Sequence, residues 1–159
     1  RYPLVTGVQT CALPISSRDE MFTAIKGGGA SLNGNPIRVS QSSILEKSML
    51  ATGFPYNVRE NPGNCVEHFH NFLFASRALR RLGSAAIDAC WVASGRFDGF
   101  YEVSLSPWDM AAASLIISEA GGKVTNFYSD TFDLYQKSFM VSNGLIHEQM
   151  MEVLRMVKK

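Results

Sequence analysis

The sequence lacks several features that would place it in a specialised class of protein. Its 159 residues contain no run of about 18 apolar residues, so no membrane-spanning helix is predicted. The formal net charge is only +1, which provides no extended field for nucleic acid or an anionic membrane. The cysteines are few, odd in number and widely spaced (Cys11, Cys65 and Cys90), which argues against a disulfide framework. We therefore expect a protein of a reducing, cytoplasmic compartment, without membrane or nucleic-acid partners.

The opening residues depart from an otherwise ordinary globular composition of 46% apolar and 18% charged residues. There is no initiator Met, the run VTGVQTCALPI is too interrupted for a signal peptide, and Pro14 should end a strand. Back-translation of that run resembles a common short-read sequencing adapter, and the same reading frame accounts for residues 1–15. We therefore expect residues 1–16 to be a non-native leader, and residues 17–159 to begin within a gene.

Hydrophobic periodicity and turn residues predict alternating strands and helices in the rest of the chain. Strands are expected at residues 21–26, 48–52, 97–102, 123–127 and 138–141. Helices are expected at residues 65–82, 83–93, 107–120 and 145–157. Asn33-Gly34 predicts a hairpin turn between two strands. This alternation indicates a layered α/β domain.

Two acidic residues near the start of the third predicted helix are candidates for chemistry. Ser106, Pro107 and Asp109 form a good helix start, in which Asp109 can accept a hydrogen bond as part of a capping box. The helix that follows is apolar on nearly all sides, which predicts that it is buried. Its N-terminus would then lie where a buried element opens toward a site. Asp109 and Glu102, seven residues earlier, could therefore converge on a metal or substrate. Glu119, in the last turn of that helix, is expected at a solvated surface position, and the alternative is a buried hydrogen-bonding partner.

Four segments, taken in order, resemble the inositol monophosphatase family of metal-dependent, lithium-sensitive sugar-phosphate phosphatases. They are MFTAIKGGGASLNGNPIRVS, RRLGSAAIDACWVASGRFDGFYE, PWDMAAASLIISEAGG and FDLYQKSFMVSNGLIHEQM. The third is the most specific, and the similarity extends over residues 21–159. Ala113 stands where that family usually has glycine.

The resemblance implies a layered α/β sandwich of the sugar-phosphatase type and a Mg²⁺-dependent attack of water on a phosphate monoester. It implies that Asp109 is a metal ligand and also lines the substrate. It implies that Glu102 binds a ring hydroxyl, and that Gly83, Ser84 and Ala85 line the substrate at a helix N-terminus. The substrate would be an inositol monophosphate or a related sugar phosphate. Nucleotide 3′(2′),5′-bisphosphates, fructose 1,6-bisphosphate and histidinol phosphate are the alternatives, and a homodimer is expected.

The resemblance also shows what is missing. Most metal ligands of that family belong to an upstream Glu and a D-P-[IL]-D-G-T motif. Here the only Asp before Asp88 is Asp19, and neither Asp-Pro nor Asp-Gly-Thr occurs. One carboxylate cannot hold two or three hydrated Mg²⁺ ions. We therefore expect the carboxy-terminal portion of the fold without its amino-terminal portion, no complete catalytic set and no activity. A different interpretation is a non-catalytic partner of transcription or ribosome-maturation machinery.

Other motifs have simpler interpretations. His68 and His70 are two apart on a predicted helix and cannot converge on zinc with Cys65. The glycines of residues 26–30 are followed by no Gly-Lys-Ser/Thr, so a hairpin bend is expected rather than a phosphate loop. We expect core packing for one group (Trp91, Phe97, Phe100 and Tyr101). For a second (Arg77, Arg80 and Arg81) we expect a cationic, solvated helix end, and the alternative is binding of phosphate or a partner, since the resemblance places this stretch near the substrate and the subunit interface.

Overall fold

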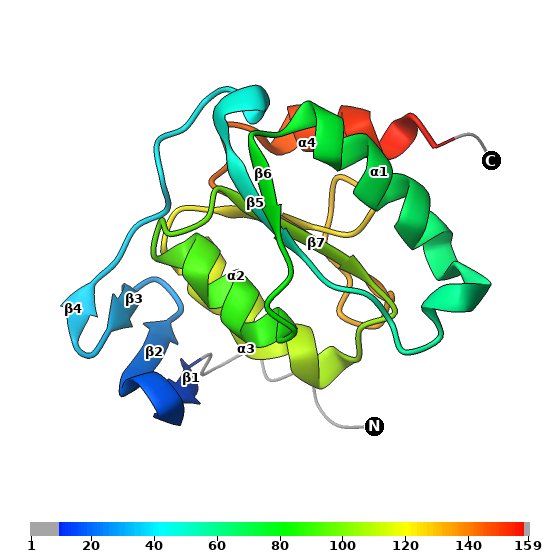
Figure 1. The fold of residues 1–159 in the computed structure, drawn as a ribbon. Coiled ribbons are helices and arrows are strands. Elements are labelled where there is room, and N and C mark those ends of the chain that lie inside the picture. Colours follow the sequence, from blue (N-terminus) through cyan, green and yellow to red (C-terminus); the bar gives the residue numbers. More distant parts are fainter. Residues whose placement is uncertain (1–9, 158–159) are drawn as a thin grey trace.

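A computed structural model describes residues 10–157, which form four layers (Figure 1). The strands are β1 (Thr10–Ile15), β2 (Glu20–Ile25), β3 (Gly29–Leu32), β4 (Asn35–Pro36), β5 (Met49–Thr52), β6 (Ala78–Arg80), β7 (Gly99–Val103), β8 (Lys123–Thr125) and β9 (Ser138–Ser142). The helices are α1 (Cys65–Ala75), α2 (Ala85–Ala93), α3 (Pro107–Glu119) and α4 (His147–Arg155). Strands β1 to β4 form one outer layer, and α2 and α3 pack beneath it. The other five strands separate these helices from α1 and α4, which confirms the predicted α/β class.

The opening run contributes a strand at Thr10–Ile15, which its interrupted pattern and Pro14 did not favour. This strand pairs antiparallel with β2, from Thr10 opposite Ile25 to Ile15 opposite Glu20. Pro14 is tolerated because β1 is the edge strand of the described sheet, where a missing N–H breaks no ladder. Alternate residues of the strand, Cys11, Leu13 and Ile15, pack on the core beside α3. Residues 1–9 of the predicted leader lie outside the described residues.

The glycine-rich segment forms the two predicted bends of the first sheet. Residues 26–28 turn the chain between β2 and β3, with Gly27 at a φ of +75°. Asn33 and Gly34 form the second turn, at φ values of +50° and +79°. Both values lie in the left-handed region that Asn and Gly tolerate best, as a primed hairpin turn requires.

The second sheet has the strand order β6-β5-β7-β9-β8. β5 pairs in parallel with β6 and β7, whereas β9 runs antiparallel to β7 and β8. The predicted helix over residues 65–82 is therefore too long, because α1 ends at Ala75 and β6 follows. Ser76 is extended, and the Arg77 N–H donates to the Ser48 carbonyl, 3.0 Å away, which starts the pairing with β5. The other predicted elements occur with shifted ends, and three of them differ from the observed elements by only one residue at one end: 48–52, 107–120 and 138–141.

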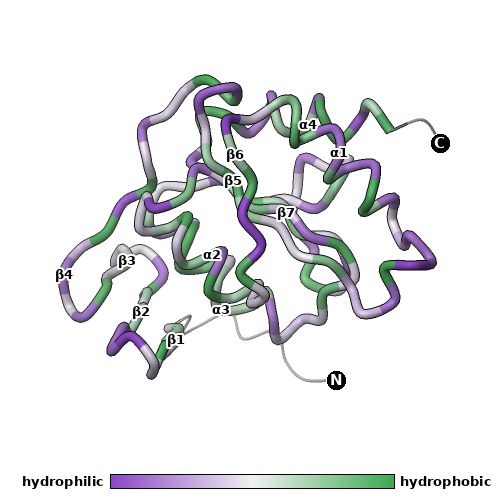
Figure 2. Tube along the Cα trace, in the orientation of Figure 1, coloured by the Kyte–Doolittle hydropathy of each residue, from purple (hydrophilic) through white to green (hydrophobic). Residues whose placement is uncertain are grey.

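Two apolar clusters hold the layers together, one on each face of the second sheet. Side chains alternate along its strands, so Ala51 and Phe100 face α2 and α3 whereas Leu50 and Tyr101 face α1 and α4. Phe72 of α1 stacks on Tyr101 with ring centroids 4.1 Å apart. Figure 2 shows the apolar segments concentrated in α2 and the central strands. None of the helices within residues 10–157 is long and apolar enough to cross a membrane.

Candidate functional site

The candidate site is a cavity of about 710 Å³ where the start of α2, the end of β7 and the start of α3 meet. We call it the acidic cavity. It contains all five of the residues that the sequence predicted to bind substrate or metal: Gly83, Ser84, Ala85, Glu102 and Asp109. The structure therefore brings these residues together, while their individual roles stay a prediction.

Local capping explains how two of these residues are positioned. Ser84 is the N-cap of α2, and its Oγ accepts a hydrogen bond from the Ile87 N–H at 3.5 Å. Asp109 lies in the first turn of α3, where its Oδ2 accepts the Ser106 N–H at 2.9 Å. The capping interpretation of Asp109 is thus confirmed for Oδ2, while Oδ1 accepts no hydrogen bond from the described residues. Two helix N-termini, each with a positive dipole end, border the same space.

Glu102 is the most perturbed acid that lines the acidic cavity. Its pKa is raised to about 7, mainly by burial and then by the nearby carboxylates of Asp88 and Asp109, while Arg81 acts in the opposite direction. Its carboxylate occupies the space next to Gly53 that a Cβ at that position would fill. A buried acid held against bare backbone in this way is poised to exchange hydrogen bonds with a ligand.

Three residues of this region were missed as contributors to the site. Gly53 was not singled out from the sequence, and Arg81 was expected at a solvated helix end, with phosphate or partner binding as its alternative. The structure instead places both in the cavity lining. Asp88 of α2 is fully buried, its carboxylate oxygens have no hydrogen-bond partner among the described residues, and burial raises its pKa to about 7. No sequence signal marked Asp88, because it sits among apolar residues of a helix.

The described residues supply part of a metal site rather than a complete one. Within residues 10–157 no three His, Cys, Asp or Glu side chains are placed to hold one metal ion. Asp109 offers one oxygen, which fits a single ligand position for a hard cation. The acidic cavity also has more acidic than basic side chains, with Glu102 and Asp109 against Arg81. Such a lining would hold a phosphate dianion poorly unless a cation accompanied it.

The histidines of α1 do not converge. His68 is buried, and its Nε2 lies 3.1 Å from the Tyr128 hydroxyl, while His70 is exposed on another side of the helix and packs on Phe74. Among the predicted core aromatics, Phe97, Phe100 and Tyr101 are buried. Trp91 is only partly buried, and the guanidinium groups of two arginines lie over its ring (Arg18 and Arg96).

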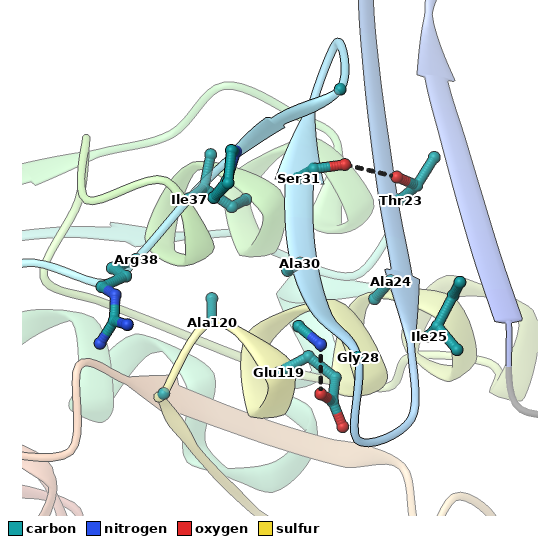
Figure 3. Close-up of a pocket in the computed structure, with 14 residues that line it drawn as sticks. Thr23, Ala24, Ile25, Gly28, Ala30, Ser31, Ile37, Arg38, Glu119 and Ala120 are labelled. Carbon is teal, nitrogen blue, oxygen red and sulfur yellow. Dashed lines mark hydrogen bonds between the residues drawn. The ribbon is translucent and has the colours of Figure 1, made fainter.

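A second cavity, of about 550 Å³, lies between the first sheet and the end of α3 (Figure 3). We call it the hairpin cavity. Glu119 reaches across to the turn between β2 and β3, where its two carboxylate oxygens accept the N–H groups of Gly27 and Gly29, each at 2.9 Å. On the neighbouring strands the hydroxyls of Thr23 and Ser31 lie 2.7 Å apart. Glu119 therefore combines the two alternatives, because it accepts hydrogen bonds from another segment and yet is not buried.

Comparison with known proteins gives consistent matches. A sequence profile of the inositol monophosphatase family matches residues 4–159. The chain is 42% identical to Phosphatase IMPL1, chloroplastic, of Arabidopsis thaliana over 139 residues, which cover 87% of the chain and 38% of that protein. It is 41% identical to Inositol-1-monophosphatase of Synechocystis sp. over 137 residues, or 86% of the chain and 48% of that protein. It is 44% identical to Nus factor SuhB of Escherichia coli over 110 residues, or 69% of the chain and 41% of that protein.

The fold agrees with these sequence matches. The structure of inositol monophosphatase from Anabaena superposes with a TM-score of 0.87 at 38% identity, covering 94% of this chain and 60% of that one. The chain spans about half the length of the curated relatives that it matches. The profile match and β1 both include residues of the predicted leader, whose origin in adapter DNA stays a prediction. By sequence and by fold, the chain belongs to the inositol monophosphatase family.

Proposed function

We propose that this chain is the carboxy-terminal part of a Mg²⁺-dependent phosphomonoesterase that acts on an inositol monophosphate or a related sugar phosphate. The observation that carries the proposal is the acidic cavity, in which five residues from three separate elements meet. Family membership supports phosphatase chemistry, and the names of the Arabidopsis and Synechocystis relatives agree with it. The partial length of the match supports an active site that is shared with further sequence.

Within this proposal each residue has a distinct role. Asp109 is one ligand of the metal through the oxygen that does not cap α3, and it also contacts substrate. Glu102 accepts or donates a hydrogen bond to a ring hydroxyl, for which a pKa of about 7 is suited because both protonation states are accessible. Gly83, Ser84 and Ala85 present the N-terminus of α2 to an oxygen of the substrate.

The metal would supply the positive charge that the cavity lacks and would lower the pKa of the attacking water. The chain's own residues bind and orient. The start of α2 binds one oxygen of the ester, and Glu102 forms a hydrogen bond with a hydroxyl of the substrate. The hydrogen bond that caps α3 holds Asp109 in place. The alternative substrates, among them nucleotide bisphosphates and fructose 1,6-bisphosphate, use the same arrangement and differ in the alcohol part of the ester.

A second candidate function is a non-catalytic binding role in transcription or ribosome-maturation machinery. It is favoured by the similarity to the Escherichia coli protein named Nus factor SuhB. The gene sequence upstream of residue 17 would distinguish these two functions. An intact Glu and D-P-x-D-G-T motif there would favour the phosphatase, and degenerate motifs would favour binding alone.

The metal role of Asp109 can be tested on the chain itself with Mn²⁺ as a paramagnetic probe. The two tryptophans give two indole N–H signals in nitrogen-15 NMR spectra, and Trp108 is adjacent to Asp109. We expect Mn²⁺ to broaden the Trp108 signal before that of Trp91, and Asp109→Asn to remove this preference. Asp130→Asn, at an exposed acid outside the cavity lining, is the matched control. Equal broadening in wild type and Asp109→Asn would contradict the metal role.

Activity is tested separately. We expect the 159-residue chain to release no phosphate from inositol 1-phosphate in the presence of Mg²⁺, because one carboxylate is an incomplete ligand set. The assay is colorimetric phosphate detection with and without Li⁺. Lithium-sensitive turnover by this chain would show that the set of site residues assigned here is incomplete. For the extended gene product, absence of turnover on every ester tried would overturn the proposed enzyme.

A further inference from the structure

Asp88 is the one carboxylate among residues 10–157 that is fully buried, and the proposed function gives it no role. It lies in α2, four residues after the N-cap Ser84, whose carbonyl accepts the Asp88 N–H at 2.9 Å. Both of its carboxylate oxygens lack a hydrogen-bond partner within the described residues. Buried polar groups are hydrogen-bonded in the great majority of cases, so a buried carboxylate without a partner calls for a physical reason.

The fold brings a second acid to the same side of the second sheet. Side chains alternate along β7, so Glu102 projects to the same face as Phe100, and α2 packs on that face. The Glu102 carboxylate lies against Gly53 and lines the acidic cavity next to the start of α2. The two acids are close enough for the charge of Asp88 to raise the pKa of Glu102. Glu102 therefore has an opening to the cavity, whereas Asp88 has none.

Little positive charge compensates these two acids. Arg81 favours the ionised form of both, but forms no salt bridge within the described residues. Asp109, at the start of α3, adds a further negative charge that acts on Glu102. Three other groups line a small hollow with Glu102 (Cys65, His68 and Tyr101). Burial lowers the pKa of this imidazole and raises the pKa of the thiol and of the phenol, so all three are uncharged at neutral pH.

We propose that Asp88 and Glu102 form a buried acid pair that shares one proton at neutral pH, in which Asp88 is a positioning residue that sets the charge of Glu102. Two ionised carboxylates at close range repel each other, and a proton kept by either one removes that repulsion. Because Asp88 does not reach the cavity, it acts only through Glu102. The inference rests on the proposed function for the ligand of Glu102, a hydroxyl of the substrate, and adds how the protonation of that contact is controlled.

The consequence concerns the direction of the hydrogen bond between Glu102 and the substrate. With the proton on Asp88, Glu102 is ionised and accepts a hydrogen bond from the hydroxyl. With the proton on Glu102, the carboxylic acid donates to the hydroxyl oxygen instead. A hydroxyl suits both cases, since it donates one hydrogen and accepts through two lone pairs. The acid pair lets Glu102 change its role while the proton stays within the protein.

The experiment is a pH titration of the side-chain carboxyl carbons in carbon-13 NMR spectra of the full 159-residue chain. Asp88→Asn and Glu102→Gln assign the two signals. In wild type we expect each signal to titrate in two steps with the same two midpoints, as interacting sites do. In Asp88→Asn the amide resembles the protonated acid, so Glu102 should titrate in a single step. Its midpoint should lie about one pH unit or more below the upper wild-type step.

Glu102→Gln provides an independent test of the same interaction. Because the coupling between two sites is reciprocal, the Asp88 midpoint should fall in this variant by as much as the Glu102 midpoint falls in Asp88→Asn. A merely structural role of Asp88 would not produce equal shifts. Asp130→Asn is the matched control, because it removes an exposed carboxylate outside the cavity lining, and it should leave both wild-type steps in place. The backbone amide spectrum of each variant checks the fold.

The outcomes separate this inference from the proposed function. Single-step titrations with different midpoints in wild type, or unequal shifts in the two variants, would overturn the acid pair and leave the phosphatase proposal standing. Shared steps that become single, equally shifted steps in the variants would support the pair even if the extended gene product hydrolyses no ester. If one variant fails to fold, the wild-type curves and the other variant still decide between these results.

Discussion

The hairpin cavity and the acidic cavity lie at opposite ends of α3 and use glutamates in opposite ways. In the hairpin cavity Glu119 accepts two main-chain N–H groups, which lower its pKa. In the acidic cavity Glu102 is buried beside other acids, and its pKa is raised to about 7. The first carboxylate is satisfied by the protein and joins the β2–β3 turn to α3. The second carboxylate has no hydrogen-bond partner within residues 10–157, and such a group is the better candidate for contact with a ligand.

The comparison also shows why size alone does not identify a site. The two cavities differ little in volume, about 550 Å³ against about 710 Å³. Their polar groups differ far more, because the ones around the hairpin are already paired with each other: Glu119 with Gly27 and Gly29, and Thr23 with Ser31. A ligand would have to displace these internal bonds, whereas in the acidic cavity it would satisfy groups left without partners.

The largest expected effect comes from filling the space next to Glu102. Gly53→Ala would place a Cβ where the Glu102 carboxylate lies, so one of the two must move. We expect a loss of about 1–3 kcal/mol in the free energy of unfolding, measured by urea denaturation. Adding Glu102→Ala should restore part of the loss, because it removes the atoms in conflict. Additive effects in the double variant would show that Glu102 is not held against Gly53.

A smaller effect is expected from the protonation of Glu102. The folded chain holds a proton up to pH about 7 that the unfolded chain releases near its ordinary pKa of 4.5. The contribution of Glu102 to stability is therefore complete below pH 4.5 and is lost as the pH rises through about 7. Relative to wild type, Glu102→Gln should be nearly neutral at pH 4 and stabilising by about 2 kcal/mol at pH 8. A difference independent of pH would contradict the raised pKa.

The smallest effect is expected at the hairpin, with the opposite dependence on pH. The pKa of Glu119 is lowered by the N–H groups of Gly27 and Gly29, so its contribution is present above the ordinary pKa of 4.5. That contribution is lost as the pH falls through the folded value. Glu119→Gln should lower the melting temperature at pH 7 and approach wild type in acid. Glu152→Gln, at an exposed glutamate of α4, is the control. It should leave the melting temperature unchanged both at pH 7 and in acid.

Local patterns predicted much of the fold because the relevant signals are short-range. The capped, apolar α3 and the Asn33-Gly34 turn could both be read from neighbouring residues. Two expectations failed because distant segments decided the outcome. The hydrophobic pattern predicted residues 78–80 to be the end of a helix, but they form β6 by pairing in parallel with β5. Residues 10–15 read as a poor strand, but the adjacent β2 supplies a ladder for them.

The sequence by itself determined the α/β class, the family, and the set of five residues that could bind substrate or metal. The class follows from periodicity, whereas the family and the full set of five residues follow from the resemblance of short motifs, and both are properties of residues close together along the chain. The tertiary structure alone decided that these five share one cavity, that Gly53 and Arg81 line it as well, and that Asp88 lies close enough to raise the pKa of Glu102. It also decided that Glu119 is paired while Glu102 is not. The reason is physical: the pKa and availability of a carboxylate depend on burial and on donors that the fold brings from elsewhere in the chain.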